Sequence, residues 1–162
     1  AGSTGATGAT SGLAAYGGLY QTGAQLPAFT SANSYMQLGL NTTLPSQNVT
    51  PNANNTLTVQ QNGTYEIHYN VLLSTNKSVD IGIGIRQNGA ILPNTRSSQT
   101  LAKDSSPGSS YNGQLSGTVY VPLQQNDILD LVIAVLHTLP PNLSAVTNAN
   151  AHAILTIKKL DE

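Results

Sequence analysis

The stretch TYEIHYNVLL, from Thr64 to Leu73, alternates between two kinds of side chain. One face is apolar and carries Tyr65, Ile67, Tyr69, Val71 and Leu73. The other face carries Glu66, His68 and Asn70. Successive side chains on a β-strand point to opposite faces of the sheet. The stretch therefore predicts a strand with one buried face and one polar face.

Similar patterns recur on both sides of this stretch. Val79 to Arg86 alternates again, and Asn88-Gly89 follows it directly, which predicts a tight hairpin because both residues tolerate positive φ. Further strands are predicted at residues 15–20, 35–40, 57–60, 115–121, 128–136 and 151–159. Segments rich in Asn, Ser, Thr and Pro separate them, and residues 41–55, 103–111 and 138–150 are predicted loops. Short strands at this spacing predict an all-β fold, a two-sheet antiparallel jelly-roll sandwich.

The strand predicted at residues 128–136 is apolar on both faces, apart from Asp130. A strand of a two-sheet sandwich normally keeps one face in water. Either a loop of the same chain or a second subunit must therefore cover the extra face. We favour a subunit interface, for which the candidate residues are Ile128, Leu131, Val132, Ile133, Val135 and Leu136.

The beginning of the chain has a different pattern. Gly2, Gly5 and Gly8 open three consecutive Gly-X-Y triplets, the repeat that allows three extended chains to wind around one axis. The alternative is a flexible Gly/Ser/Thr linker. We expect residues 1–12 to be the end of a collagen-like stalk, disordered by themselves, and residues 13–162 to form a head suited to three-fold assembly.

The composition excludes several classes of function. The chain has 162 residues, of which 8% are charged, and a formal net charge of -1, so it offers no basic field for nucleic acid. It has no cysteine, which excludes disulfides and thiolate zinc sites. Its apolar runs are shorter than the roughly 20 residues of a membrane-spanning helix. The chain starts at Ala1 with no basic n-region and no apolar h-region, so no targeting segment is visible and we expect a fragment or a mature form.

The chain shows no pattern typical of an enzyme or a metalloprotein. His68, His137 and His152 do not stand at metal-ligand spacing, and no nucleophile motif occurs. We therefore expect no catalytic residue, no metal site and no cofactor. Calcium bound by loop oxygens stays an alternative, for which the carboxylates are Asp80, Asp104, Asp127 and Asp130. Glu66 and His68 share a strand face, and around a three-fold axis three copies of His68 would be able to meet.

Motifs in the order of one known family run along the chain. They are Asn62-Gly63-Thr64-Tyr65-Glu66-Ile67, Ile85-Arg86-Gln87-Asn88-Gly89, the segment from Gly117 to Asp127, and the terminal strand from Ala153 to Leu160. Over about residues 13–160 the chain resembles the trimeric jelly roll of the complement-one-q heads and the tumour-necrosis-factor superfamily. Asn126 stands where the family usually has glycine, a replacement that left-handed asparagine permits. The resemblance implies a homotrimer.

Within that family the chain looks most like the heads of BclA-type collagen-like glycoproteins of the exosporium, the outer layer of bacterial spores. That resemblance implies a structural, extracellular role as the trimerising cap of a surface filament. It also implies O-linked sugars on the stalk, for which Thr4, Thr7 and Thr10 hold the Y positions. The alternative is an adhesin or a phage or virion receptor-binding tip. Such a tip would recognise a glycan or a host surface protein through its loops at 41–55 or 138–150.

Overall fold

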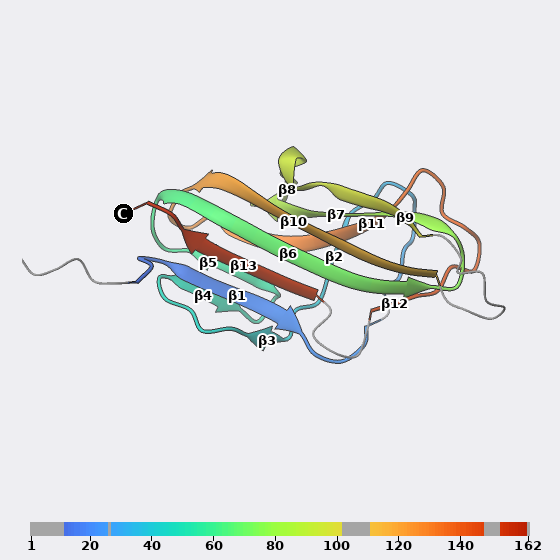
Figure 1. Ribbon diagram of the computed structural model, residues 1–162, viewed down its shortest axis with the longest axis horizontal. Coiled ribbons are helices and arrows are strands. Elements are labelled where there is room, and N and C mark those ends of the chain that lie inside the picture. Colours follow the sequence, from blue (N-terminus) through green and yellow to red (C-terminus); the bar gives the residue numbers. More distant parts are fainter. Residues whose placement is uncertain (1–11, 26, 102–110, 148–152, 162) are drawn as a thin grey trace, which may run out of the picture.

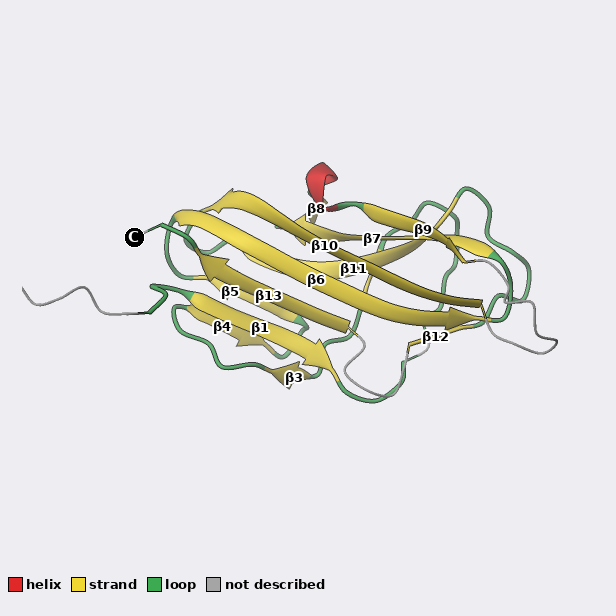
Figure 2. Cartoon of the chain, viewed as in Figure 1, coloured by secondary structure: helices red, strands yellow, loops and turns green. Residues whose placement is uncertain are grey.

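The computed structural model describes residues 12–25, 27–101, 111–147 and 153–161. The predictions for the stub lie outside these ranges; they concern Gly2, Gly5, Gly8, Thr4, Thr7 and Thr10. The described residues form two antiparallel sheets and one short 3-10 helix, η1 (Pro93–Thr95), and no helix among them is long and apolar enough to cross a membrane (Figures 1 and 2). The all-β, two-sheet prediction is confirmed.

The first sheet, sheet A, has the strand order β10-β6-β13-β1-β3, with β12 also paired to β6. Its strands are β1 (Tyr16–Gln21), β3 (Thr42–Thr43), β6 (Gly63–Thr75), β10 (Tyr111–Leu123), β12 (Ala145–Thr147) and β13 (Ala153–Lys159). The second sheet, sheet B, has the order β4-β5-β11-β7-β8, with β2 on β11 and β9 on β7. Its strands are β2 (Met36–Gln37), β4 (Val49–Asn52), β5 (Thr56–Val59), β7 (Val79–Gln87), β8 (Ala90–Ile91), β9 (Ser97–Leu101) and β11 (Ile128–Leu136).

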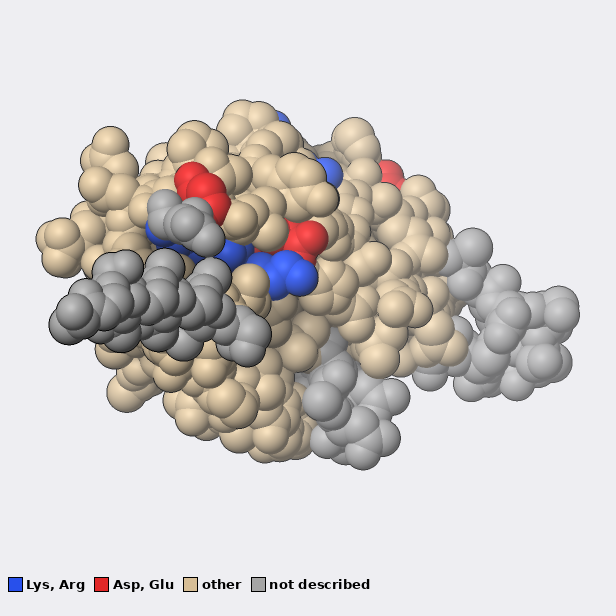
Figure 3. All heavy atoms as spheres, turned by 60° about the vertical axis from the view of Figure 1, so that its left-hand side comes forward, with Lys and Arg blue, Asp and Glu red and all other residues tan. Residues whose placement is uncertain are grey.

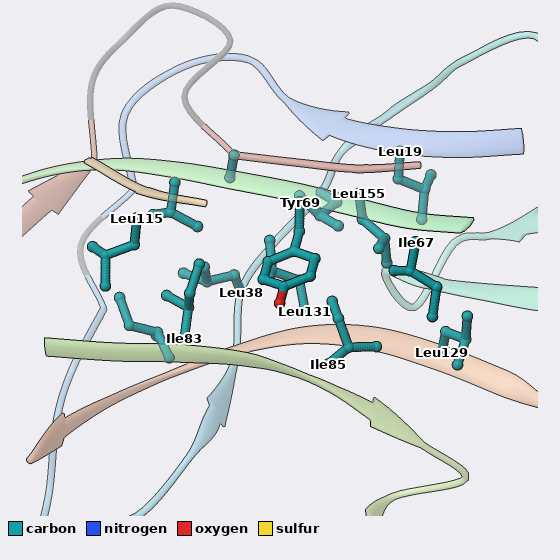
Figure 4. Packing of buried hydrophobic residues seen from close by; sticks show 14 of the residues in the cluster. Leu19, Leu38, Ile67, Tyr69, Ile83, Ile85, Leu115, Leu129, Leu131 and Leu155 are labelled. Carbon is teal, nitrogen blue, oxygen red and sulfur yellow. The ribbon is translucent and has the colours of Figure 1, made fainter. Parts of the chain in front are cut away.

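The core lies between the two sheets and is built from the apolar halves of the alternating strands. Ile67 and Tyr69 of β6 face Ile83 and Ile85 of β7, and all four are at most 1% exposed (Figure 4). The Tyr69 hydroxyl donates a hydrogen bond to the backbone carbonyl of Thr95. The buried Tyr69 hydroxyl is therefore satisfied inside the protein, as buried polar groups require.

Strand positions follow the sequence pattern where the pattern is strong. The stretch from Thr64 to Leu73 lies within β6, and residues 128–136 form β11 as predicted. Asn88 and Gly89 have φ of 52° and 84°, so the predicted hairpin is confirmed. The predicted loops were partly wrong, because 41–55 contains β3 and β4, and 138–150 contains β12. These strands are short and pair through the backbone, so their side chains alternate little.

Three asparagines that precede glycine each accept a hydrogen bond with the side-chain oxygen. The oxygen of Asn62 accepts from the Gln125 N–H at 2.7 Å, and that of Asn88 accepts from the Ile128 N–H at 2.9 Å. The oxygen of Asn112 accepts from the Ser74 hydroxyl at 2.6 Å. These bonds tie loops and neighbouring strands together.

The start of β1 and the end of β13 lie at one end of the sandwich (Figure 1). Tyr16 is paired with Lys158, and the Lys159 N–H donates to the carbonyl of Ala15 at 2.8 Å. The turns at 76–78 and 137–144 lie at the opposite end, where the Asn76 N–H donates to Ser144. We call this opposite end the far end.

Candidate functional site: the open face of sheet A

Strand β11 is covered on both faces by its own chain. Val132 and Ala134 point away from the core, yet each is 0% exposed. They lie opposite Gly84 and Gly82 of β7. A Cβ at Gly82 would lie 3.0 Å from a methyl group of Leu136, and a Cβ at Gly84 would lie 3.0 Å from one of Ile91. These two side chains therefore lie over the outward face of sheet B, in space that the glycines leave free.

This arrangement corrects the reasoning that placed a subunit interface on β11. The candidates were Ile128, Leu131, Val132, Ile133, Val135 and Leu136. Four of them are 0% exposed within one chain, namely Leu131, Val132, Ile133 and Val135. Ile128 is 43% exposed and Leu136 is half-buried. Side chains of the same chain, Leu136 of β11 and Ile91 of β8, supply the cover, so the apolar pattern of this strand needs no second subunit.

The outward face of sheet A is open instead. Strand register places its side chains in rows that run across β10, β6, β13 and β1. The first row contains Tyr120, Glu66, Lys158 and Tyr16. The second contains Thr118, His68, Thr156 and Gly18. The third contains Ser116, Asn70, Ile154 and Tyr20. We call these three rows the open face; the polar half of the predicted strand 64–73 lies at its centre.

The open face carries little charge. Its carboxylate, Glu66, lies 3.1 Å from the ammonium group of Lys158, so the two charges compensate each other. The ring of His68 lies 3.0 Å from the hydroxyl of Thr118. Figure 3 shows the same sparseness more widely, with a few red and blue side chains grouped on a surface that is otherwise uncharged. A face of this kind is able to approach copies of itself without strong repulsion.

A groove of about 370 Å³ opens on this face beside β1. Leu13, Leu44 and Pro45 supply apolar walls. Glu66, His68 and Lys158 supply a polar side. The sequence did not predict this groove, because Leu44 and Pro45 come from a segment that was predicted to be a loop. The Asn41-to-Asn55 segment returns along β1 through β3, where Thr42 pairs with Tyr20, and thereby builds the wall.

The structure does not bring the calcium candidates together within its described ranges, where no group of three or more His, Asp or Glu side chains is placed to hold a metal. Asp130 is paired with Arg86, and that hydrogen bond raises the pKa of Arg86. Asp127 accepts hydrogen bonds at the corner between β10 and β11. Asp80 accepts from Thr100 at 2.6 Å. Asp104 lies outside the described residues.

The two histidines within the described residues lie in different parts of the molecule. His68 lies on the open face, and His137 lies at the far end with its ring 3.6 Å from the Asp80 carboxylate. His152 lies outside the described residues. Glu66 and His68 line the same groove, but each already has a partner of its own, Lys158 and Thr118 respectively. The expectation of no catalytic residue stays a prediction.

A second hollow, of about 380 Å³, lies at the far end. Ser78, Asp80, His137 and Thr138 give it a polar lining, with Leu136 and Pro140 beside them. It includes the beginning of the predicted adhesive segment 138–150. The segment 41–55 does not reach it, because that segment packs along β1 and β5.

Comparison with known proteins identifies the fold. No family model matches the chain, and no curated protein matches it. Among solved structures it is similar to the tumour necrosis factor Eiger of S. frugiperda, with 12% identity, a TM-score of 0.61 and 93% of each chain covered. The fold is a tumour-necrosis-factor-like jelly roll. Murine APRIL at pH 5.0 is also similar, with 15% identity and a TM-score of 0.62 over 90% of this chain and 98% of that one. Identities this low establish the fold alone.

Proposed function

We propose that this chain is the trimerising head of a collagen-like surface filament, and that its open face forms the contact between three copies. The observation that carries the proposal is the uncovered, charge-compensated outward face of sheet A. The outward face of sheet B, by contrast, is already covered at its centre by the chain itself. Of the two sheets, sheet A therefore has the surface available for assembly.

The position of the Gly-X-Y stub supports the same sheet. Five residues separate Thr10 from Tyr16, where β1 begins. Five residues span at most about 18 Å. If residues 2–10 end a three-chain stalk, each copy of β1 starts close to the common axis. Because β1 belongs to sheet A, this short connection holds the open faces of three copies near one another.

The proposed role is structural and extracellular, and needs neither catalysis nor a cofactor. The filament would stand on a bacterial spore surface, or on a virion in the alternative setting, with sugars on Thr4, Thr7 and Thr10. The start of β1 is at one end of the sandwich, so the far end would point away from the stalk. This orientation suits a cap at the tip of a filament.

Light scattering coupled to size exclusion tests the proposal with two matched variants. Ser116 is exposed on the open face, and Ser98 is exposed on β9 of sheet B. We expect a trimer for the parent chain and for Ser98→Asp. We expect a lower mass for Ser116→Asp, with its far-ultraviolet circular dichroism unchanged, because three added carboxylates would have to be desolvated together. A monomeric parent at micromolar concentration, or a trimeric Ser116→Asp, would contradict the proposal.

A second candidate function, adhesion, is favoured by the hollow at the far end. Its polar lining includes Asp80 and His137, which suit the hydroxyl groups of a glycan, and Leu136 and Pro140 offer apolar surface. A glycan array tests this function. We expect a specific signal from the parent that is lost in Asp80→Asn and retained in Ser116→Asp. The absence of any reproducible signal would leave the purely structural role.

A further inference from the structure

We propose that Tyr120 of each copy inserts into the groove beside β1 of the next copy around the three-fold axis. The inference rests on the proposed trimer and names the contact between neighbouring copies that holds the trimer together. It is drawn from the exposure of Tyr120, the chemistry of the groove and the register of the rows.

Tyr120 is unusually exposed for an aromatic residue in a strand. Its exposed fraction is 65%, the largest among the big apolar side chains of the described residues. It lies on β10, which ends the strand order of sheet A, so its ring stands at the border of the open face. A large exposed aromatic ring with a polar tip is typical of a contact point for another protein.

The groove has the chemistry that a tyrosine side chain needs. Leu13, Leu44 and Pro45 would pack against the two faces of the ring. Glu66 and His68 lie on the polar side, where a phenol hydroxyl finds a hydrogen-bond partner. Leu13 is itself 43% exposed, so an inserted ring would also cover apolar surface that one chain leaves in water.

The strand register places Tyr120 and the groove at the same height along the strands. Tyr120 lies opposite Glu66, Glu66 lies opposite Lys158, and Lys158 lies opposite Tyr16. Three of these four residues line the groove, and the fourth is Tyr120. A rotation preserves height along its axis, so two parts of one face meet in a ring only if their heights agree. With the axis along the strands, members of one row fulfil this condition.

The contact also has the symmetry that a ring requires. Tyr120 and the groove are different patches of the same surface, so each copy offers one of each. Contacts between unlike patches form a closed ring when the rotation between copies closes, whereas a two-fold dimer pairs a patch with itself. Three such contacts would leave no tyrosine and no groove unoccupied.

A cysteine pair tests the contact directly, because the chain has no cysteine of its own. The full chain carrying Tyr120→Cys and Pro45→Cys is oxidised and run on a non-reducing gel. A disulfide needs the two Cα atoms to approach within about 7 Å. We expect covalent dimers and trimers from this pair, and none from Pro45→Cys with Ser98→Cys.

Tyr120→Cys alone provides a further distinction. Disulfides between two copies of residue 120 would show that the tyrosines meet each other at the axis, and would overturn the inference. A trimer by mass that forms no link between positions 120 and 45 would overturn the inference and leave the proposed function standing. A monomeric parent would overturn both.

Unlinked variants give an independent measure. We expect Tyr120→Ala to raise the concentration at which the trimer dissociates by at least tenfold, while Tyr120→Phe keeps most of the affinity because it keeps the ring. Residue 120 faces outward on a strand at the edge of sheet A, so we expect both variants to preserve folding of the single chain. Equal dissociation of Tyr120→Ala and the parent would contradict the inserted ring.

Discussion

Asp127 shows how a single side chain fixes the corner between β10 and β11. Its carboxylate accepts hydrogen bonds from the Gln124 N–H at 2.9 Å, from Gln87 at 2.8 Å and from Asn88 at 2.9 Å. Burial by itself would raise the pKa of Asp127, but these three donors lower it below its ordinary value. Asn126 precedes it with φ of 76°, which confirms that asparagine takes the left-handed position expected of it.

The lowered pKa predicts how acid affects stability. The folded state holds the charged form of Asp127 better than the unfolded state does, so its contribution is present above the ordinary pKa of 3.8 and disappears as pH falls through the lower folded value. In Asp127→Asn, the new side-chain NH₂ group would face N–H groups that now donate to the carboxylate, so donor would meet donor. We expect it to lower the free energy of unfolding by about 1–2 kcal/mol at pH 7.

Urea denaturation at several pH values measures the effect of Asp127→Asn. The difference between variant and parent is expected to narrow as the pH falls below 3.8, where the carboxyl of the parent becomes protonated too. A difference that stays constant from pH 7 to pH 2.5 would show that the charge of Asp127 does not contribute.

Gly117 makes room for Tyr69 in the core. A Cβ at Gly117 would collide with the hydroxyl end of the Tyr69 ring. We therefore expect Gly117→Ala to cost about 1–3 kcal/mol of stability, the usual range for overpacking. In a Tyr69→Phe background the added cost is expected to shrink, because the nearest atom is gone. Denaturation midpoints of the four proteins in this cycle provide the test, with Ser116→Ala as the neighbouring control.

At the scale of the element, β11 is the strand to probe, since it pairs with β7, β5 and β2 in sheet B. Val132 is fully buried on its outward face. We expect Val132→Asp to prevent folding of the single chain, because an unpaired carboxylate would be buried there. Circular dichroism and the soluble yield would show it.

The contrast with the open face makes the test specific. Thr118 is exposed on β10 of sheet A, and we expect Thr118→Asp to give a folded chain. If Val132→Asp yielded a folded monomer instead, β11 would belong to a subunit interface after all, and the assignment of the cover to side chains of the same chain would be wrong.

Elements with strong alternation could be predicted from the sequence, and elements without it could not. The period of two in Thr64 to Leu73 depends only on burial of one face, so it is visible in a single sequence. By contrast, β9 reads Ser97-Ser98-Gln99-Thr100-Leu101 and has only Leu101 buried. It forms because its backbone pairs with β7, which is a non-local cause that leaves little trace in its side chains.

The cover of β11 could not be predicted from the sequence for a related reason. The apolar pattern of 128–136 showed that both faces are buried, but a pattern does not say which atoms provide the cover. Leu136 and Ile91 provide it. The open face came from residues such as Glu66 and Asn70, which look like any solvent-facing half of a strand. Only the register across four strands shows that the row of Glu66 contains Tyr120 at one border and the groove at the other.

At the scale of the whole molecule, the proposed assembly predicts that the head is sufficient for it. Nine residues of Gly-X-Y sequence in each chain are too few for a stable triple helix, whereas the open face is part of the head. We expect a chain that begins at Gly12 to keep the trimeric mass of the full chain. Sedimentation equilibrium of both chains measures this, and a monomeric shortened chain would show that the stub holds the copies together.

The three held asparagines have a consequence for chemical ageing. An asparagine before glycine deamidates when its side-chain carbon swings over the following amide nitrogen and closes a five-membered imide. The side-chain oxygen accepts a hydrogen bond from another residue in Asn62, Asn88 and Asn112. The rotation of the side chain that deamidation needs would have to break this hydrogen bond first. We expect peptide mass spectrometry after months of storage to find these sites intact in the folded chain. In the urea-unfolded chain, the same three sites would be converted to aspartate and isoaspartate within weeks.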